Sequence, residues 1–191
     1  MALYDYAHLC RKSYVGGSEF VDVDDLRFGI FVRDGKWNVV FRGSANRQNW
    51  LRDFDIVAAR SPHGYLTHRG ILEAFTHLWP HILDKIPSNP SYVRAVGHSL
   101  GGGIAAQMAH HFGCVAVTFG APRLWWSGNQ PPRISHVRVA CDDDPVAMIP
   151  RWLFKHDCQE RIMLEDKDCE FVNVDDHDID VYISRLKWCT E

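Results

Sequence analysis

The sequence contains no cluster of lysine and arginine, no long apolar run and no low-complexity tract. Its 21 Lys and Arg residues are outnumbered by 24 Asp and Glu residues, which leaves a formal net charge of −3. Proteins that bind nucleic acid present a basic patch, so nucleic acid is excluded as the main partner. A membrane-spanning helix needs roughly 18 or more consecutive apolar residues, so no transmembrane segment is expected.

The first residues also lack the basic and apolar regions of a secretory signal, and we therefore expect a cytoplasmic protein. The six cysteines could in principle form three bridges. Most cytosolic thiols stay reduced, so reduced thiols are the expected state.

The size and composition of the chain are those of an ordinary globular protein, with 191 residues of which 46% are hydrophobic. A chain of this size buries roughly 70% of its extended surface on folding, which is enough for one sizeable core. No internal repeat or linker divides the sequence. We expect residues 1–191 to form a single domain.

Apolar periodicity in the first half predicts an amphipathic helix over residues 3–14 and a β-hairpin over residues 28–42. Asp34-Gly35 supplies the tight type I′ turn of that hairpin. Three further segments are expected in order: a helical turn over 49–54, a loop over 56–67, and a helix from about 69 to 82 that Pro80 kinks or interrupts.

The second half alternates short apolar runs with helical patterns, which predicts a mostly parallel sheet covered on both faces. The fold class is therefore α/β. The expected strands cover 92–96, 114–119 and 134–141, and the expected helices cover 100–112 and 179–188. Residues 161–174 are expected to form a surface hairpin.

The strongest local motif is Gly97-His98-Ser99-Leu100-Gly101, which lies between a predicted strand and a predicted helix. This is the context of a nucleophile elbow, where a serine is held on a sharp turn and side chains at the two glycine positions would clash. Gly-x-Ser-x-Gly occurs by chance in about 6% of chains of this length, so its position between strand and helix matters as much as the pattern.

A serine hydroxyl needs a histidine base and a carboxylate that orients the base before it can act as a nucleophile. The chain has 11 histidines, so the order along the sequence must select one. In α/β-hydrolases the order is serine, acid, histidine. The run Asp142-Asp143-Asp144 follows a predicted strand, and His177 precedes the last predicted helix.

Six ordered motifs then resemble those of the class 3 lipase family, the fungal-type triacylglycerol lipases with their feruloyl esterase and phospholipase A1 relatives. The motifs are Phe41-Arg-Gly-Ser through Trp50-Leu-Arg-Asp53, His68-Arg-Gly-Ile-Leu72, Gly97-His-Ser-Leu-Gly-Gly102, Phe119-Gly-Ala-Pro-Arg123, Asp144-Pro-Val and Asp176-His177. The resemblance implies an α/β-hydrolase fold and covers most of the chain.

The resemblance also implies a role for individual residues. Ser99 matches the nucleophile, Asp144 the acid and His177 the base, although the neighbouring Asp143 could replace Asp144 in a slightly different turn. The backbone N–H groups of Ser44 and Leu100 match the oxyanion hole. These groups are sufficient for ester cleavage, so no metal or organic cofactor is expected.

The substrate implied by the resemblance is an ester, most of all an acylglycerol or a phospholipid, reached through transient contact with a lipid interface. Residues 46–54 occupy the place of the family's lid and could form a mobile lid or a fixed loop. A soluble aryl or feruloyl esterase and a catalytically silent binding module are the alternatives. Secretion would be indicated if Cys10 were bridged to Cys189, or Cys158 to Cys169.

The other conspicuous side chains receive structural interpretations. Among the histidines, we expect a structural role for His68, partial burial inside the elbow for His98, no metal pairing for His77 and His81, and favourable charge at a helix end for His110-His111. Among the aspartates, Asp53 is expected to brace a loop, and Asp22, Asp24 and Asp25 are expected to form a solvated turn. The tryptophans Trp125, Trp126 and Trp152 could line an acyl groove or fill the core.

Overall fold

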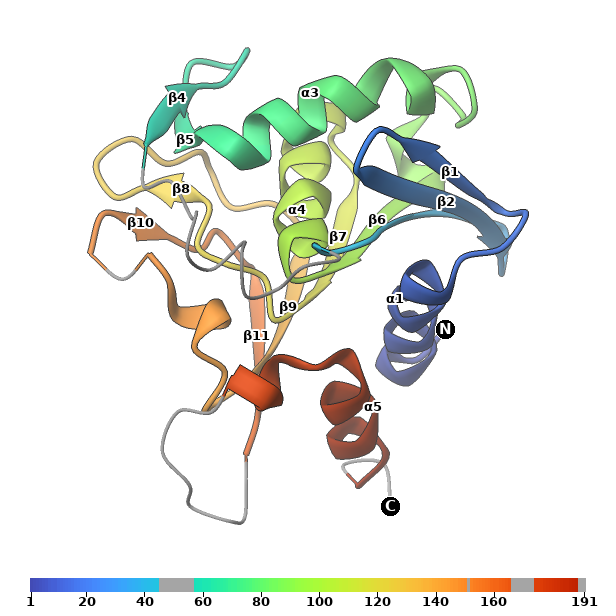
Figure 1. The fold of residues 1–191 in the computed structure, drawn as a ribbon. Helices are drawn as coiled ribbons and strands as arrows, with labels where there is room; N and C mark the ends of the chain where they lie inside the picture. Colours follow the sequence, from blue (N-terminus) through green and yellow to red (C-terminus); the bar gives the residue numbers. More distant parts are fainter. Residues whose placement is uncertain (45–56, 151, 166–173, 189–191) are drawn as a thin grey trace.

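A computed structural model describes residues 1–44, 57–150, 152–165 and 174–188. Its framework is a seven-stranded sheet with strand order β1-β2-β3-β6-β7-β9-β11 (Figure 1). The strands are β1 (Phe20–Val23), β2 (Leu26–Arg33), β3 (Lys36–Phe41), β6 (Val93–His98), β7 (Val115–Phe119), β9 (His136–Cys141) and β11 (Glu160–Leu164). Among the described strands of this sheet, only β1 with β2 and β2 with β3 pair antiparallel, so the predicted mostly parallel sheet is confirmed.

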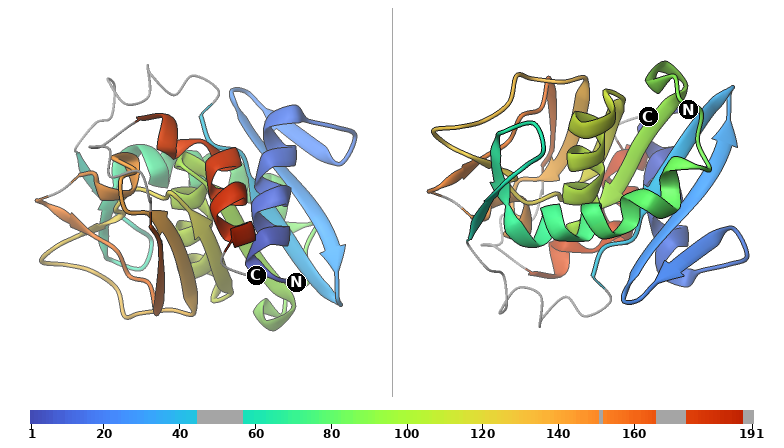
Figure 2. Two further views of the ribbon diagram at one scale, coloured as in Figure 1. Left: turned by 90° about the horizontal axis from the view of Figure 1, so that it is seen from below. Right: turned by 90° about the horizontal axis from the view of Figure 1, so that it is seen from above.

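Helices cover both faces of this sheet (Figure 2). On one face lie α3 (Arg69–Leu83) and α4 (Leu100–Phe112), and on the other α1 (Leu3–Val15) packs beside α5 (Ile179–Trp188). The described residues also include the short 3-10 turns η1 (Pro90–Tyr92), η2 (Val146–Met148) and η3 (Val174–His177). The predicted helices over 3–14, 100–112 and 179–188 are all confirmed.

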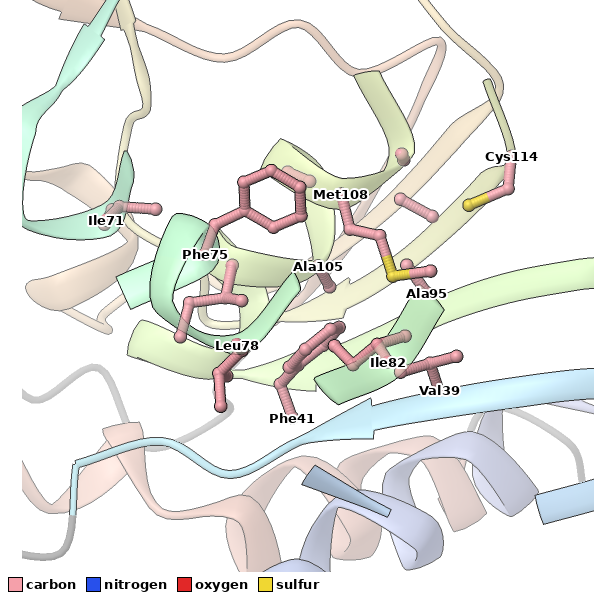
Figure 3. Packing of buried hydrophobic residues seen from close by; sticks show 14 of the residues in the cluster. Val39, Phe41, Ile71, Phe75, Leu78, Ile82, Ala95, Ala105, Met108 and Cys114 are labelled. Atoms are coloured by element: carbon pink, nitrogen blue, oxygen red, sulfur yellow. The ribbon is translucent and has the colours of Figure 1, made fainter. Parts of the chain in front are cut away.

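Each central strand is apolar on both sides because both faces are buried. Val39 belongs to the core under α3 and α4, whereas its neighbour Val40 belongs to the core under α1 and α5. Figure 3 shows the first of these cores, in which Phe41 of β3 lies near Leu78 of α3 and Met108 of α4. This double burial is the reason why the strands read as continuous apolar runs rather than as alternating ones.

The hairpin formed by β2 and β3 turns at Asp34 and Gly35, which have φ angles of 50° and 67°. Two successive positive φ angles define the type I′ turn that the Asp-Gly pair predicts. The hairpin places the end of β3 next to the end of β6. The chain that follows β3 therefore passes beside the Ser99 turn.

The predicted loop over 56–67 is wrong in part, because it contains two strands of a second, smaller sheet. This sheet has the order β10-β8-β5-β4 and is built from β4 (Ala58–Arg60), β5 (Leu66–His68), β8 (Trp125–Trp126) and β10 (Phe154–Lys155). Strands of two or three residues carry too little periodicity to be recognised in a sequence. The helical turn predicted over 49–54 lies outside the described residues.

Part of one other prediction needs correction. Residues 160–164 form β11, which pairs parallel with β9 and extends the main sheet, and residues 166–173 of the predicted surface hairpin lie outside the described residues. The helix predicted from about 69 to 82 is confirmed as α3, which continues past Pro80 to Leu83 instead of ending there. Proline removes one hydrogen bond there, and the packing of Leu78 and Ile82 in the core offsets that loss.

No helix within the described ranges is long and apolar enough to cross a bilayer. Free thiols are found at Cys10, Cys114, Cys141 and Cys158. The residues that would bridge to Cys10 and Cys158, Cys189 and Cys169, lie outside the described residues.

Candidate active site

Ser99 stands on the sharp turn that joins β6 to α4. Its φ of 58° and ψ of −131° place a residue other than glycine in a strained region of the backbone map. The turn is held because the Ser99 N–H donates to the Phe119 carbonyl at 3.0 Å, while the Ser99 carbonyl accepts from Gly102 at 2.9 Å. The strand, turn and helix of a nucleophile elbow are thus present.

The glycines around Ser99 are required by close backbone contacts. A Cβ at Gly97 would collide with the backbone of Gly101, and a Cβ at Gly101 would collide with the Phe41 carbonyl. At Gly102 a Cβ would lie 2.8 Å from the Ala121 side chain. These contacts draw the helix close to the sheet and hold the serine at its carboxyl edge.

Ser99, His177 and Asp144 form one continuous hydrogen-bonded chain. His177 Nε2 lies 2.7 Å from Ser99 Oγ, and His177 Nδ1 lies 2.8 Å from Asp144 Oδ2. All three residues are buried, with exposed fractions of 3%, 1% and 0%. Because a carboxylate only accepts, Nδ1 carries the proton, which leaves Nε2 of the neutral ring free to accept the serine proton.

The carboxylate of Asp144 is fixed by three further donors. Its Oδ1 accepts from the N–H groups of Val146 and Ala147 at 2.8 and 3.3 Å, at the start of η2. Its Oδ2 accepts from the hydroxyl of Tyr182 on α5 at 2.5 Å. Burial raises the pKa of the Tyr182 hydroxyl well above its ordinary value, and the Asp144 charge adds to the shift, so the phenol stays protonated and donates.

The neighbouring aspartate, Asp143, points elsewhere. Its two oxygens accept a bidentate pair of bonds from Arg185 at 2.9 and 3.1 Å, and Arg185 also contacts Asp176 at 3.0 Å. The structure therefore places Asp144, and not Asp143, against His177.

His98 contacts His177 through a hydrogen bond and through ring stacking. His98 Nε2 donates to the His177 carbonyl at 2.8 Å, and the two rings stack with centroids 4.7 Å apart. Because Nε2 carries the proton in the neutral ring, Nδ1 accepts the hydrogen bond from the Tyr14 hydroxyl at 2.7 Å. Sequence reasoning missed Tyr14 and Tyr182, since each is an ordinary apolar position of a terminal helix.

The segment after β3 passes close to Ser99. A Cβ added at Gly43 would lie 3.0 Å from Ser99 Cβ and 2.9 Å from the His98 carbonyl, and it would collide with the Tyr14 hydroxyl. Ser44 follows this contact directly. Leu100 is the first residue of α4, and its N–H therefore has no acceptor within the helix.

Gly120 lies against Asp144, Tyr182 and His177. Gly120 has φ of 54°, and a Cβ there would meet Asp144 Oδ2 at 2.8 Å, the Tyr182 hydroxyl at 2.9 Å and His177 Cε1 at 3.0 Å. Any side chain at this position would press on the acid, its donor and the base together.

His68 has a structural role, as predicted, because its Nδ1 accepts from the Ile71 N–H at 3.4 Å and caps α3. Asp53 and the predicted lid over 46–54 lie outside the described residues. Trp125 is buried in the core, whereas Trp152 is 88% exposed.

The interpretation of His110-His111 as favourable helix-end charge is wrong for His111. His110 contacts the buried carboxylate of Asp157, which also accepts from His136 at 3.2 Å. Burial by itself raises the pKa of Asp157, but these two hydrogen bonds lower it below its ordinary value. Burial lowers the pKa of His111, which lies among aromatic rings and is therefore disfavoured as a cation.

Within the described ranges, no group of three His, Cys, Asp or Glu side chains is arranged to hold a metal ion. His77 and His81 lie four residues apart on α3, with ring centroids 6.4 Å apart. His77 contacts Asp24 at 2.9 Å, and Asp24 stands in the turn between β1 and β2 with φ of 50°. Asp22 belongs to β1 and pairs with Arg27 at 2.6 Å.

Comparisons with known proteins agree with this architecture. The family model "Lipase (class 3)" matches residues 38–154. A lipase of Rhizomucor miehei is 39% identical over 74 residues, which are 35% of this chain and only 20% of that protein.

Solved structures extend the likeness to nearly the whole fold. A Rhizomucor miehei triacylglyceride lipase superposes with a TM-score of 0.73 at 22% identity, covering 92% of this chain and 91% of that one. A lipase of Rhizopus microsporus var. chinensis gives a TM-score of 0.69 at 18% identity, over 89% of this chain and 75% of that one. The matched family model spans more than half of the sequence, from β3 to the start of β10, and includes both the turn that carries Ser99 and the loop after β9 that carries Asp144. The chain therefore belongs to the class 3 lipase family.

Proposed function

We propose that this protein is a serine carboxyl-ester hydrolase that works through an acyl-enzyme. The observation that carries the proposal is the unbroken chain from Ser99 Oγ to His177 at 2.7 Å and from His177 to Asp144 at 2.8 Å. One structural neighbour, with a TM-score of 0.72, is described as a triacylglycerol lipase whose catalytic centre is a serine protease triad. The same arrangement of groups supports the same chemistry here.

In the proposed reaction, Ser99 Oγ attacks the ester carbonyl carbon while His177 Nε2 takes the serine proton. The tetrahedral intermediate collapses with cleavage of the bond to the alcohol oxygen, and His177 returns the proton to that oxygen. Water then attacks the acyl-enzyme by the same steps and releases the acid. Asp144 stabilises the imidazolium that forms in each half-reaction.

The oxyanion is assigned to the backbone N–H groups of Leu100 and Ser44. The Leu100 N–H stands at the positive end of α4, where a developing negative charge is favourable. Gly43 lets the segment that follows β3 pass close to Ser99, which supports the assignment of the Ser44 N–H to the oxyanion hole. Loss of one such donor costs about 3 to 4 kcal/mol of transition-state stabilisation.

Acylglycerols or phospholipids are the proposed substrates, on the strength of the family and of its lipase members. Transient contact with a lipid interface is supported by two adjacent exposed apolar residues, Trp152 and Leu153, with exposed fractions of 88% and 42%. Tryptophan is favoured at membrane–water interfaces because its ring is apolar while its N–H remains hydrated.

Hydrolysis of p-nitrophenyl esters from acetate to palmitate, with and without detergent micelles, tests this proposal. We expect activity from the unmodified chain and a loss of at least about 1,000-fold in Ser99→Ala. Ser184→Ala, at an exposed position on α5, serves as the matched control and should retain full activity. Preference for long acyl chains with activation by micelles supports a lipase, and preference for short or aryl esters without activation supports a soluble esterase. Equal inactivity of all variants would favour a silent binding module.

A cytoplasmic location is also a proposal, supported by the four free thiols among the described residues. Alkylation with N-ethylmaleimide in acid-quenched, denatured cells, followed by intact mass measurement, tests it. Six adducts are expected for the six cysteines, and fewer would show that bridges form.

A further inference from the structure

A polar pocket lies beside the loop after β9 that carries Asp144, and neither Ser99, His177 nor Asp144 lines it. Its volume is ≈ 110 Å³, and its walls come from β9, β11 and the segments around η2. Three arginines and a histidine line it, namely Arg123, Arg138, Arg161 and His156. No aspartate or glutamate is present among the described residues that line this pocket.

Two of these arginines are neighbours in the sheet. Arg138 of β9 is the register partner of Arg161 of β11, so the two side chains leave the same face at the same level. Like charges directly opposite each other on paired strands are destabilising. An anion placed between them would remove that repulsion.

Arg138 carries the strongest indication of a missing partner. The residue is 2% exposed, and its Nη2 donates to the Ala147 carbonyl at 2.8 Å. Its Nε is buried and has no hydrogen-bond partner in the described part of the chain. Burial lowers the pKa of Arg138 to about 10, so the guanidinium is still charged at neutral pH. A buried charge of this kind is costly unless a counter-charge accompanies it.

The outer arginine is also bonded to a poor acceptor. Arg161 Nε donates to Met163 Sδ at 2.9 Å, and a thioether sulfur accepts only weakly. The guanidinium fork matches the oxygens of phosphate and carboxylate groups, which accept two parallel N–H bonds. Both Arg138 and Arg161 thus retain donors suited to such a group.

We propose that this pocket binds a small oxyanion, with phosphate as the best-matched chemistry, between Arg138 and Arg161. The site is separate from the triad but shares one residue, Ala147, with the loop that carries Asp144. The Ala147 carbonyl accepts from Arg138 and His156 at 2.8 and 3.1 Å, whereas the Ala147 N–H donates to Asp144 at 3.3 Å. An anion that orders Arg138 therefore stabilises the loop that carries Asp144. The proposal does not depend on ester hydrolysis.

Titration calorimetry of the whole chain with inorganic phosphate, at constant ionic strength maintained with chloride, tests the proposal. We expect saturable binding of one phosphate and a rise of the unfolding temperature with phosphate concentration, because a ligand of the native state stabilises it. Arg161→Gln should weaken phosphate binding about tenfold or more, since it removes one charge-assisted partner. Arg161 is exposed, so this variant is expected to fold.

Arg33→Gln is the matched control because it removes the same charge from an exposed position at the end of β2, nearer the opposite edge of the sheet. It should bind phosphate as the unmodified chain does. Vesicles of phosphatidylcholine with and without phosphatidic acid distinguish a lipid headgroup from free phosphate as the source of the anion. Absence of saturable phosphate and vesicle binding, or equal weakening by Arg33→Gln and Arg161→Gln, would overturn the proposal.

Discussion

Gly120→Ala is the substitution that most sharply connects the fold to the chemistry. An alanine Cβ would stand 2.8 Å from Asp144 Oδ2 and 3.0 Å from His177 Cε1, whereas ordinary contacts begin at 3.4 Å. These atoms must therefore retreat by 0.6 and 0.4 Å, the differences between those distances. The positive φ of 54° adds a backbone strain of about 1 to 2 kcal/mol.

The matched control is Gly35→Ala in the turn between β2 and β3. Gly35 has a similar φ of 67°, but nothing lies within 4 Å of its added Cβ. Both variants pay the strain of about 1 to 2 kcal/mol, and only Gly120→Ala also displaces the acid and the base. A misplacement of about 1 Å can reduce catalysis about 100-fold, so we expect a loss of at least about tenfold for Gly120→Ala. Gly35→Ala should stay within about twofold of the unmodified chain when both are assayed at a temperature where they are folded.

The assays are urea unfolding for stability and p-nitrophenyl ester hydrolysis for activity. If Gly120→Ala lost no more activity than Gly35→Ala at equal fractions of folded protein, the claim that Gly120 leaves room for the triad would be refuted.

Three further predictions concern buried polar groups. Tyr182→Phe should lower the free energy of unfolding, measured in urea, by about 1.5 to 3 kcal/mol, because a buried hydroxyl no longer donates to the Asp144 carboxylate. Tyr92→Phe, at a 51% exposed position, should change this free energy little. Equal effects of the two variants would contradict the role given to the Tyr182 hydroxyl. Asp157→Asn should cost about 3 kcal/mol or more at pH 7, against at most about 1 for the exposed Asp180→Asn. The pKa of Asp157 is lowered in the folded chain, so its contribution is present above an unfolded pKa of about 3.9 and should fade in melting curves below that pH. Burial lowers the pKa of His156 well below its ordinary value, so on acidification the unfolded chain takes up the proton before the folded chain does, and stability should fall as the pH drops below about 6.5. His156→Gln should reduce the dependence of the melting temperature on pH between about pH 7 and 5, and an unchanged pH dependence in this variant would contradict the prediction.

The elements that sequence patterns predicted are those with a strong local signal. The type I′ turn at Asp34-Gly35, the strand and helix around Ser99 and the last helix all follow from periodicity or from turn chemistry. The parallel pairing of β11 with β9 was missed because parallel partners are joined by distant chain segments and leave no hairpin signature. The small sheet was missed because its strands are too short to show a period.

At the site, the sequence could name Ser99, Asp144 and His177 through motifs and their order. It could not show that Tyr14 and Tyr182, from helices at opposite ends of the chain, hydrogen-bond to His98 and to Asp144. Those contacts depend on how α1 and α5 pack against one face of the sheet. The charge expected at His111 was misjudged for a related reason, since burial among rings from α3 lowers its pKa.

The central claim, that Ser99 is the nucleophile activated by His177, is tested most directly by covalent labelling with diethyl p-nitrophenyl phosphate. The reagent transfers its diethyl phosphoryl group to an activated serine and releases p-nitrophenolate. The account predicts one equivalent of p-nitrophenolate per chain, a single adduct that peptide mapping places on Ser99, and no adduct in Ser99→Ala. Labelling of Ser99→Ala to the same extent, or labelling of a residue other than Ser99 in the unmodified chain, would contradict it.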